Sequence, residues 1–291
     1  MKVSGFTFIR NAIKLDYPIL EAIQSILPLC DEVVVAVGNS EDETLQLVRA
    51  IDPKIRVIET VWDDSLREGG RVLAVETAKA FKAISKDSDW AIYIQGDEVM
   101  HEDYYGNIRQ AMHDFENDPK VDGLLFNYRH FYGSYDYIGD AIKWYPKEIR
   151  IIKNNPEIYS FGDAQGFKKG AGEKLNVADI DAYIHHYGWV KSPDAMQRKQ
   201  ESFHKLWHSD SWVEQNVAKA EEFDYSEVKA LWKFEGKHPS VMQKRIQEKG
   251  WDFDHDISRN SFSRKERFKK WAQKITGKPL GEHQNYVITR N

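Results

Sequence analysis

The first hundred residues alternate between two hydrophobic periods. Four short apolar runs, rich in β-branched and aromatic residues, fit strands that are buried on both faces: 3–9, 32–37, 55–59 and 90–94. The segments between them carry apolar residues at every third or fourth position, which predicts amphipathic helices over 19–27, 40–51 and 70–84. This alternation indicates an α/β fold with a Rossmann-like, mostly parallel sheet flanked by helices, and ligands bound beyond the carboxyl ends of its strands.

Start and stop signals support the predicted helices. Pro18 is expected to open the first helix and Pro28 to end it, because proline lacks the amide proton that a helix interior needs. Ser40, with Glu43 three residues later, matches the capping-box pattern. We therefore expect the second helix to begin at Ser40.

The pattern changes after about residue 120. Strand-like runs there are joined by irregular loops rich in tyrosine and tryptophan, and helical patterns return at 193–208, 213–222 and 239–249. We therefore divide the chain into an α/β domain, residues 1–190, and a helical C-terminal extension, residues 191–291, packed against it.

Composition narrows the class of protein. The 291-residue chain has a net charge of −5, without the overall positive charge of a nucleic-acid binder. The single cysteine, Cys30, has no partner for an internal disulfide, and no stretch approaches the roughly 18 apolar residues of a membrane span. We expect a cytoplasmic protein whose membrane contact, if any, is peripheral.

Two acids follow the fourth predicted strand. Asp97 and Glu98 come directly after "WAIYIQG", so they lie at the ligand-binding edge of the predicted sheet. Carboxylates at a strand end can simply cap a loop. Beside a nucleotide site, however, the usual partner of carboxylate oxygens is a divalent cation, and this context favours a metal site.

Three segments, taken in order, resemble family 2 glycosyltransferases with a GT-A fold. They are "FTFIRNA" at 6–12, "VGNSEDET" at 37–44 and "IYIQGDE" at 92–98, and the resemblance covers roughly residues 3–190. It implies that this domain moves a sugar from a nucleotide-sugar donor, UDP-sugar by default, to a glycan or lipid-linked acceptor. It also implies help from Mn²⁺ or Mg²⁺ and, by expectation, inversion at the transferred carbon.

The resemblance assigns donor and metal residues. Asp97 matches the last acid of the family's Asp-x-Asp segment, which holds the metal, whereas Gln95 replaces its first acid. The acid that relatives use to read the base corresponds to Val37, so the base identity stays open. The donor-binding candidates are Arg10, Asn39, Arg71, Gln95 and Asp97.

A late histidine is the second metal ligand that the resemblance implies. His186 precedes Tyr-Gly, as the corresponding histidine does in related sequences, and His185 is the alternative. Adjacent residues of an extended segment point to opposite faces, so at most one of the two can readily face the metal.

Inverting transfer needs a base that takes the acceptor's proton. Asp163, in "YSFGDAQGFKKG", lies on a glycine-flanked loop where many relatives carry an acid, although Gly-Asp also forms ordinary turns. Glu98 and Asp136 are the alternatives.

Near the end, "SRKERFKKWAQKITGK" at 263–278 places Phe268 and Trp271 on one face of a basic helix. Such a helix can rest on an anionic membrane that holds a lipid-linked acceptor, or simply dock on the protein.

Two rival functions remain. A nucleotidyltransferase shares the parallel sheet and acidic metal site, but it is expected to carry a glycine-rich phosphate loop after the first strand, and "IRNAIKLDY" has no glycine. A sugar- or nucleotide-binding module that has lost its chemistry is the non-enzymatic alternative, because Gln95 and Val37 depart from the family pattern.

Overall fold

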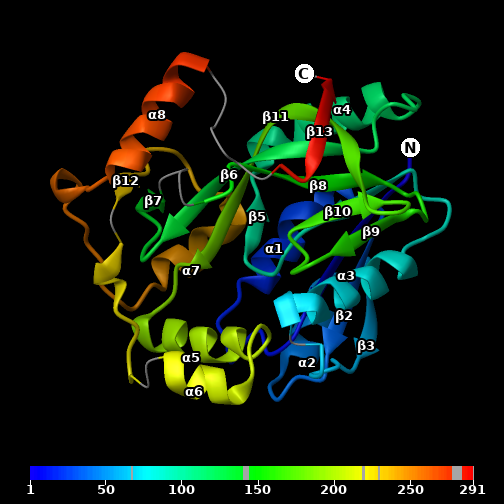
Figure 1. Ribbon diagram of the computed structural model, residues 1–291. Coiled ribbons are helices and arrows are strands. Elements are labelled where there is room, and N and C mark those ends of the chain that lie inside the picture. Colours follow the sequence, from blue (N-terminus) through cyan, green and yellow to red (C-terminus); the bar gives the residue numbers. More distant parts are fainter. Residues whose placement is uncertain (67, 140–143, 218–219, 229, 277–283, 291) are drawn as a thin grey trace.

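A mostly parallel sheet forms the centre of the computed structural model, which describes residues 1–66, 68–139, 144–217, 220–228, 230–276 and 284–290 (Figure 1). Its strands are β1 (Val3–Ile9), β2 (Glu32–Gly38), β3 (Ile55–Thr60), β4 (Trp90–Tyr93), β5 (Glu98–Met100), β6 (Gly123–Tyr132), β7 (Tyr137–Gly139), β8 (Lys147–Lys153), β9 (Ile158–Phe161), β10 (Gly166–Lys169), β11 (Glu173–Trp189), β12 (Leu231–Lys233) and β13 (Tyr286–Arg290). The α-helices are α1 (Ile19–Ile26), α2 (Thr44–Arg49), α3 (Arg71–Ala83), α4 (Tyr105–Phe115), α5 (Pro193–His204), α6 (Asp210–Asn216), α7 (Gln243–Gln247) and α8 (Arg264–Thr276).

The strand order confirms the α/β fold expected from the sequence. Along β3–β2–β1–β4–β8–β6–β11, strand β8 runs opposite to both of its neighbours, and the other strands all point the same way. The carboxyl ends of β1, β2, β3 and β4 therefore meet at one edge of the sheet, where ligands bind in folds of this class.

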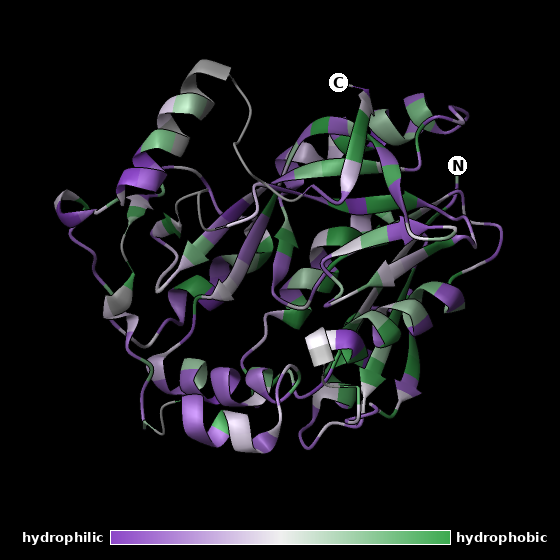
Figure 2. Ribbon diagram, viewed as in Figure 1, coloured by the Kyte–Doolittle hydropathy of each residue, from purple (hydrophilic) through white to green (hydrophobic). Residues whose placement is uncertain are grey.

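Both faces of the sheet are covered, as the unbroken apolar runs predicted. In β2, Val33, Val35 and Val37 belong to the core cluster under α1, α2 and α4. Val34 and Ala36 point the other way, into the cluster under α3. Figure 2 shows the hydrophobic residues concentrated on the central strands and on the helix faces that cover them.

The predicted capping box is wrong. Helix α2 begins at Thr44, and its N-cap residue, Glu43, makes no side-chain capping hydrogen bond. The hydroxyl of Ser40 instead accepts a hydrogen bond from the backbone N–H of Asn11 (3.0 Å) and donates to the carbonyl oxygen of Gly38 (3.1 Å). Ser40 therefore joins the exits of β1 and β2 rather than starting a helix.

The C-terminal part contains two strands besides the helices of the expected extension. Strand β12 pairs with β7, and β13 pairs in parallel with β11, so this part adds strands to the sheet. It also contacts the first helix region, because Arg245 binds Asp16 (2.6 Å) and Glu21 (3.1 Å). A domain boundary at residue 190 stays a prediction.

The basic segment forms helix α8, at one corner of the molecule in Figure 1. Phe268 and Trp271 are each 60% exposed, so these two aromatic rings are not docked on the protein. No helix within the described ranges is long and apolar enough to cross a membrane. Contact between α8 and a membrane surface stays a prediction.

A buried ion pair connects the first residue of β5 to the reversed strand β8. Arg150 grips Glu98 with two hydrogen bonds, Nε to Oε2 at 2.8 Å and Nη2 to Oε1 at 2.7 Å, and both side chains are fully buried. Tyr128 of β6 donates a further hydrogen bond to Glu98 Oε1 at 2.7 Å. One carboxylate thus holds together three parts of the sheet.

We expect Arg150→Met to destabilise the protein by about 3–5 kcal/mol, because it leaves the Glu98 charge buried without its partner. Urea unfolding followed by circular dichroism measures this loss. Arg198→Met is the matched control, since its ion pair with Asp194 is about half exposed and its loss should cost less than about 1 kcal/mol. Equal effects of the two substitutions would contradict this account of the buried pair.

Candidate active site

The predicted donor-binding residues gather at the carboxyl edge of the sheet. Arg10 follows β1, Asn39 follows β2, and Gln95 and Asp97 follow β4. Because these strands are parallel and adjacent, their exits lie side by side. Sequence reasoning missed Trp62, which follows β3 at the same edge.

Trp62 connects Arg10 with Asn39. The guanidinium of Arg10 lies over the Trp62 ring, 5.5 Å from its centroid, and the Trp62 backbone N–H donates to Asn39 Oδ1 at 3.2 Å. Arg10 also pairs with Asp64 at 3.2 Å. Two buried donors, Arg10 Nε and Trp62 Nε1, have no hydrogen-bond partner within the described ranges. Such donors suit the oxygen atoms of a bound ligand.

The loop of Asp163 packs beside the start of α3. Arg71, the first residue of α3, is exposed and follows Gly70, whose left-handed backbone has a φ of 69°. A Cβ atom at Gly70 would lie 3.1 Å from Asp163 Cβ, so glycine permits this close approach. The structure therefore places the backbone just before Arg71 beside Asp163.

The turn that carries Asp163 is conformationally strained. Ala164 has a φ of 66°, a region that residues with a side chain rarely adopt, and it is fully buried. Its carbonyl oxygen accepts a hydrogen bond from Gln95 Nε2 at 3.1 Å. Burial raises the pKa of Asp163 above its ordinary value, a shift that suits a general base.

Asp97 and His186 face one another. Asp97 Oδ2 lies 3.8 Å from His186 Nε2 and 3.2 Å from the Nζ atom of Lys199 on α5. Burial alone would raise the pKa of Asp97. The neighbouring positive charges, with Lys199 the strongest, outweigh burial and lower this pKa to about 2. Asp97 is therefore an anion at neutral pH.

A chain of hydrogen bonds orients the ring of His186. His130 Nε2 lies 2.8 Å from the Tyr145 carbonyl oxygen, which can only accept, so this nitrogen carries a proton. Burial lowers the pKa of His130 to about 3, so its Nδ1 is unprotonated and accepts from His186 Nδ1 at 3.1 Å. Burial likewise lowers the pKa of His186. His186 Nε2 therefore turns a lone pair toward Asp97.

These donor atoms fit a divalent cation. A lone pair and a carboxylate oxygen face each other across 3.8 Å, and an oriented neutral histidine is a common metal ligand. A Cβ atom at Gly188 would lie 2.6 Å from His186 Nε2 and 2.7 Å from Asp97 Oδ2, so only glycine lets both side chains approach the backbone this closely. Within the part of the chain that the structure describes, no cluster of three or more His, Cys, Asp or Glu completes the site.

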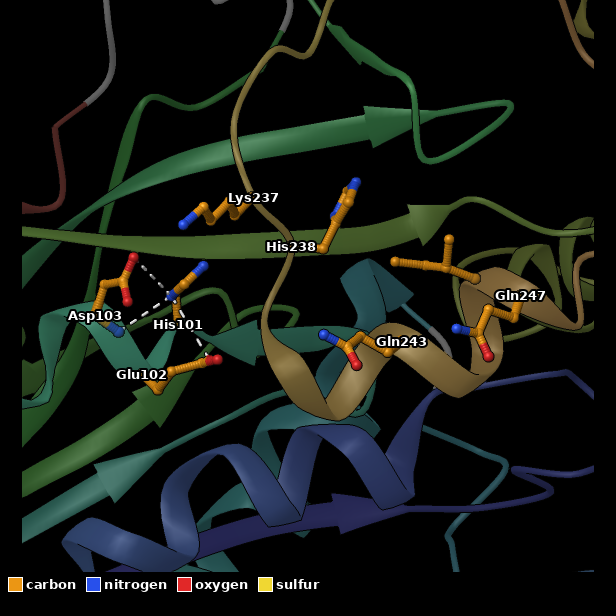
Figure 3. Close-up of a pocket in the computed structure, with 8 residues that line it drawn as sticks. His101, Glu102, Asp103, Lys237, His238, Gln243 and Gln247 are labelled. Carbon is orange, nitrogen blue, oxygen red and sulfur yellow. Dashed lines mark hydrogen bonds and ion pairs between the residues drawn. The ribbon is translucent and has the colours of Figure 1, made fainter.

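His185 points to the opposite face of β11. It is fully buried, with its Nε2 3.1 Å from Arg129 Nη1 and its ring 5.4 Å from that of His101. A surface pocket of about 480 Å³ lies on this face, and Figure 3 shows its polar lining residues, His101, Glu102, Asp103, Lys237, His238, Gln243 and Gln247. His185 is therefore not placed to share a ligand with Asp97.

Two alternative base residues have other roles in this structure. Glu98 is fully buried and gripped by Arg150, so it has no access to an acceptor, which corrects its candidacy as a catalytic group. Asp136 is exposed in a turn, where its carboxylate accepts a hydrogen bond from Ser134 at 3.1 Å. Asp163 is thus the remaining candidate base.

No protein-family model matches the chain, and no curated protein matches it. Among solved structures, residues 1–349 of Staphylococcus aureus TarS in complex with UDP align at 15% identity and a TM-score of 0.42, covering 76% of this chain and 68% of that one. The chain spans 41% of a longer TarS chain.

Two further solved structures are similar over less of the chain. Mycobacterium tuberculosis glucosyl-3-phosphoglycerate synthase, in complex with Mn²⁺, UDP and glucosyl-3-phosphoglycerate, aligns at 19% identity with a TM-score of 0.30, over 45% of this chain and 44% of that one. Mannosyl-3-phosphoglycerate synthase from Rubrobacter xylanophilus aligns at 19% identity with a TM-score of 0.30, over 47% and 42%. All three proteins are GT-A-type glycosyltransferases. At these identities and scores, the case for a function rests on the site's own residues.

We expect Gly188→Ala to abolish Mn²⁺ binding at Asp97 and His186, because the added methyl group would occupy the space between them. Electron paramagnetic resonance of free Mn²⁺, with and without UDP, measures this loss. Overpacking should also cost about 1–3 kcal/mol of stability. Gly106→Ala in α4 is the control, since open space surrounds Gly106 and alanine favours a helix. Unchanged Mn²⁺ binding in Gly188→Ala would show that the ion, if bound, lies elsewhere.

Proposed function

We propose that this chain is a glycosyltransferase that moves a sugar from a nucleotide-sugar donor to a glycan or lipid-linked acceptor. The supporting observation is the arrangement at one sheet edge. Donors for a nucleotide, an anionic carboxylate with an oriented histidine, and a loop carrying a half-buried acid all meet there. The sequence resemblance to family 2 glycosyltransferases predicted most of these residues at these positions.

The donor residues divide into two groups. Arg10, Asn39 and Trp62 supply hydrogen-bond donors, a carbonyl acceptor and an aromatic face, which suit the base and ribose of a nucleotide. Arg71 and Gln95 lie nearer to Asp163, where the sugar and diphosphate would sit in this proposal. We take UDP as the donor nucleotide.

Asp97 and His186 are proposed to hold Mn²⁺ or Mg²⁺. Such an ion neutralises the charge that develops on a departing nucleoside diphosphate. The protein's own part is to present Asp97 as an anion and His186 as a neutral ligand with its lone pair directed at the site. Both features come from their surroundings: Lys199 beside Asp97, and His130 behind His186.

Asp163 is proposed to take the acceptor's proton. Gln95 holds the turn of Asp163 in place through a hydrogen bond. The raised pKa of Asp163 means that its carboxylate binds a proton more strongly, which suits a general base. Direct attack of the deprotonated acceptor would invert the transferred carbon. We further propose that the reaction occurs in the cytoplasm, where a lipid-linked acceptor would lie at the inner face of the membrane, near α8.

The donor class is tested by measuring hydrolysis of UDP-, GDP-, CMP- and dTDP-sugars with Mn²⁺ or Mg²⁺. We expect UDP-sugar hydrolysis in the wild type and a sharp loss of metal-dependent UDP binding in Asp97→Asn, because the amide carries no charge. His186→Ala should reduce this binding more mildly. Release of pyrophosphate from a nucleoside triphosphate and a sugar phosphate would indicate a nucleotidyltransferase instead. UDP-sugar binding without any turnover would indicate a binding module.

We expect Asp163→Asn to lower sugar transfer on the order of 100-fold or more while leaving UDP affinity nearly unchanged, as for the loss of a general base. The wild-type transfer rate should rise with pH as Asp163 loses its proton, and the variant should lose this rise. Asp136→Asn is the matched control and should behave as the wild type. If both variants transfer sugar normally, Asp163 is only a turn residue.

A further inference from the structure

A lysine from α5 is the closest cation to the candidate metal ligands. Lys199 is only 9% exposed, and its ammonium group donates to Asp97 Oδ2 at 3.2 Å and to the Gly188 carbonyl oxygen at 2.7 Å. Gly188 is also the residue at which a side chain would clash with His186 Nε2. The ammonium group thus neutralises Asp97 right beside the second candidate metal ligand, His186.

A simple structural role explains only part of this arrangement. An ion pair with Asp97 would anchor α5 to the sheet edge, but a helix can be anchored without burying an ammonium group, which is costly to remove from water. The ammonium group of Lys199 lies over the Tyr17 ring, 5.1 Å from its centroid, and that of the buried Lys191 lies 4.8 Å from the same centroid. Two lysines therefore converge from the second half of the chain on the edge where the phosphates of a donor would lie.

Lys199 and a divalent cation compete for Asp97. A doubly charged ion bound by Asp97 and His186 would lie within a few ångströms of the ammonium group, where like charges repel strongly. The lysine side chain has a flexible four-carbon stem, so its ammonium group can move while α5 stays in place. Its three N–H groups suit phosphate oxygens as well as they suit a carboxylate.

We propose that Lys199 is an exchangeable counter-ion that neutralises Asp97 in the ligand-free protein and binds the donor's diphosphate when a divalent cation takes its place. This inference rests on the proposed function. The exchange couples binding of the cation to binding of the diphosphate. A cation that binds alone must displace the ammonium group of Lys199 and leave it without a partner. When the diphosphate binds as well, it becomes the new partner of that ammonium group.

The coupling predicts opposite effects of one substitution. Lys199→Met should bind Mn²⁺ alone on the order of tenfold more tightly, because the competitor is gone. The same variant should bind UDP in the presence of Mn²⁺ on the order of tenfold more weakly, because a diphosphate contact is gone. A site that is weak only because it has few ligands would show no gain in Mn²⁺ affinity.

The experiment measures Mn²⁺ binding by electron paramagnetic resonance and UDP binding by calorimetry for four proteins. Lys199→Gln removes the charge but keeps a donor for Gly188, so it should behave as Lys199→Met does and separates charge from packing. Lys205→Met removes an exposed lysine just after α5 and should match the wild type. Thermal unfolding confirms that each variant is folded.

Two outcomes would overturn the proposal. If Mn²⁺ affinity falls or stays unchanged in both Lys199 variants, Lys199 does not compete with the cation. If UDP affinity is unchanged in them, Lys199 does not bind the diphosphate. If wild-type protein binds no UDP under any condition, the proposed function fails instead, and the Mn²⁺ measurements still decide whether Lys199 is a competing counter-ion.

Discussion

The bidentate contact between Arg150 and Glu98 is the interaction on which the site depends. Glu98 lies at the end of the turn that carries Gln95 and Asp97, and its Oε2 also accepts the backbone N–H of Gln95 at 3.1 Å. The same carboxylate is bound from β8 by Arg150 and from β6 by Tyr128. Glu98 therefore sets the position of Asp97, because Glu98 fixes the turn and Asp97 faces the site.

Sequence reasoning succeeded where a feature depends on neighbouring residues or on the order of the strands. The strands and helices of the first half follow from hydrophobic periods, which depend only on neighbouring residues. The convergence of Arg10, Asn39 and Asp97 follows from the parallel arrangement of their strands. The pairing of Asp97 with His186 followed from the family resemblance and from the alternation of side chains along an extended segment.

The same reasoning failed where a residue's partner is distant in the chain. No sequence pattern near Glu98 predicts that Arg150 will neutralise it. Likewise, no pattern near Asp97 predicts its ion pair with Lys199. The capping signal at Ser40 was outweighed by a tertiary contact to Asn11. Strand β11 was missed as one long element because its burial pattern changes along its length: it alternates from Leu175 to Ile184, with a shift at Ala178, and is then continuously buried to Gly188. Its path became visible only through its pairing with β6.

Gln95 shows how a departure from a family pattern can have a physical reason. An aspartate there could only accept hydrogen bonds, whereas the amide of Gln95 donates one to the carbonyl oxygen of Ala164. That bond holds a strained turn, whose cost is of the order of 1–3 kcal/mol, in the shape that presents Asp163. Gln95 thus replaces an acid of the family pattern in the loop after β4, and it stabilises the loop that carries Asp163.

The strand order has a consequence for how the chain is synthesised. β1 to β4 can pair as soon as they leave the ribosome, but the partner at the free edge of β4 is β8, whose first residue is Lys147. At translation rates of about 5–20 residues per second, that edge stays open for several seconds. Exposed strand edges invite pairing with other chains, so the nascent protein is most prone to aggregate in this interval. Slow codons between β4 and β8 would lengthen this interval and lower the yield of folded protein.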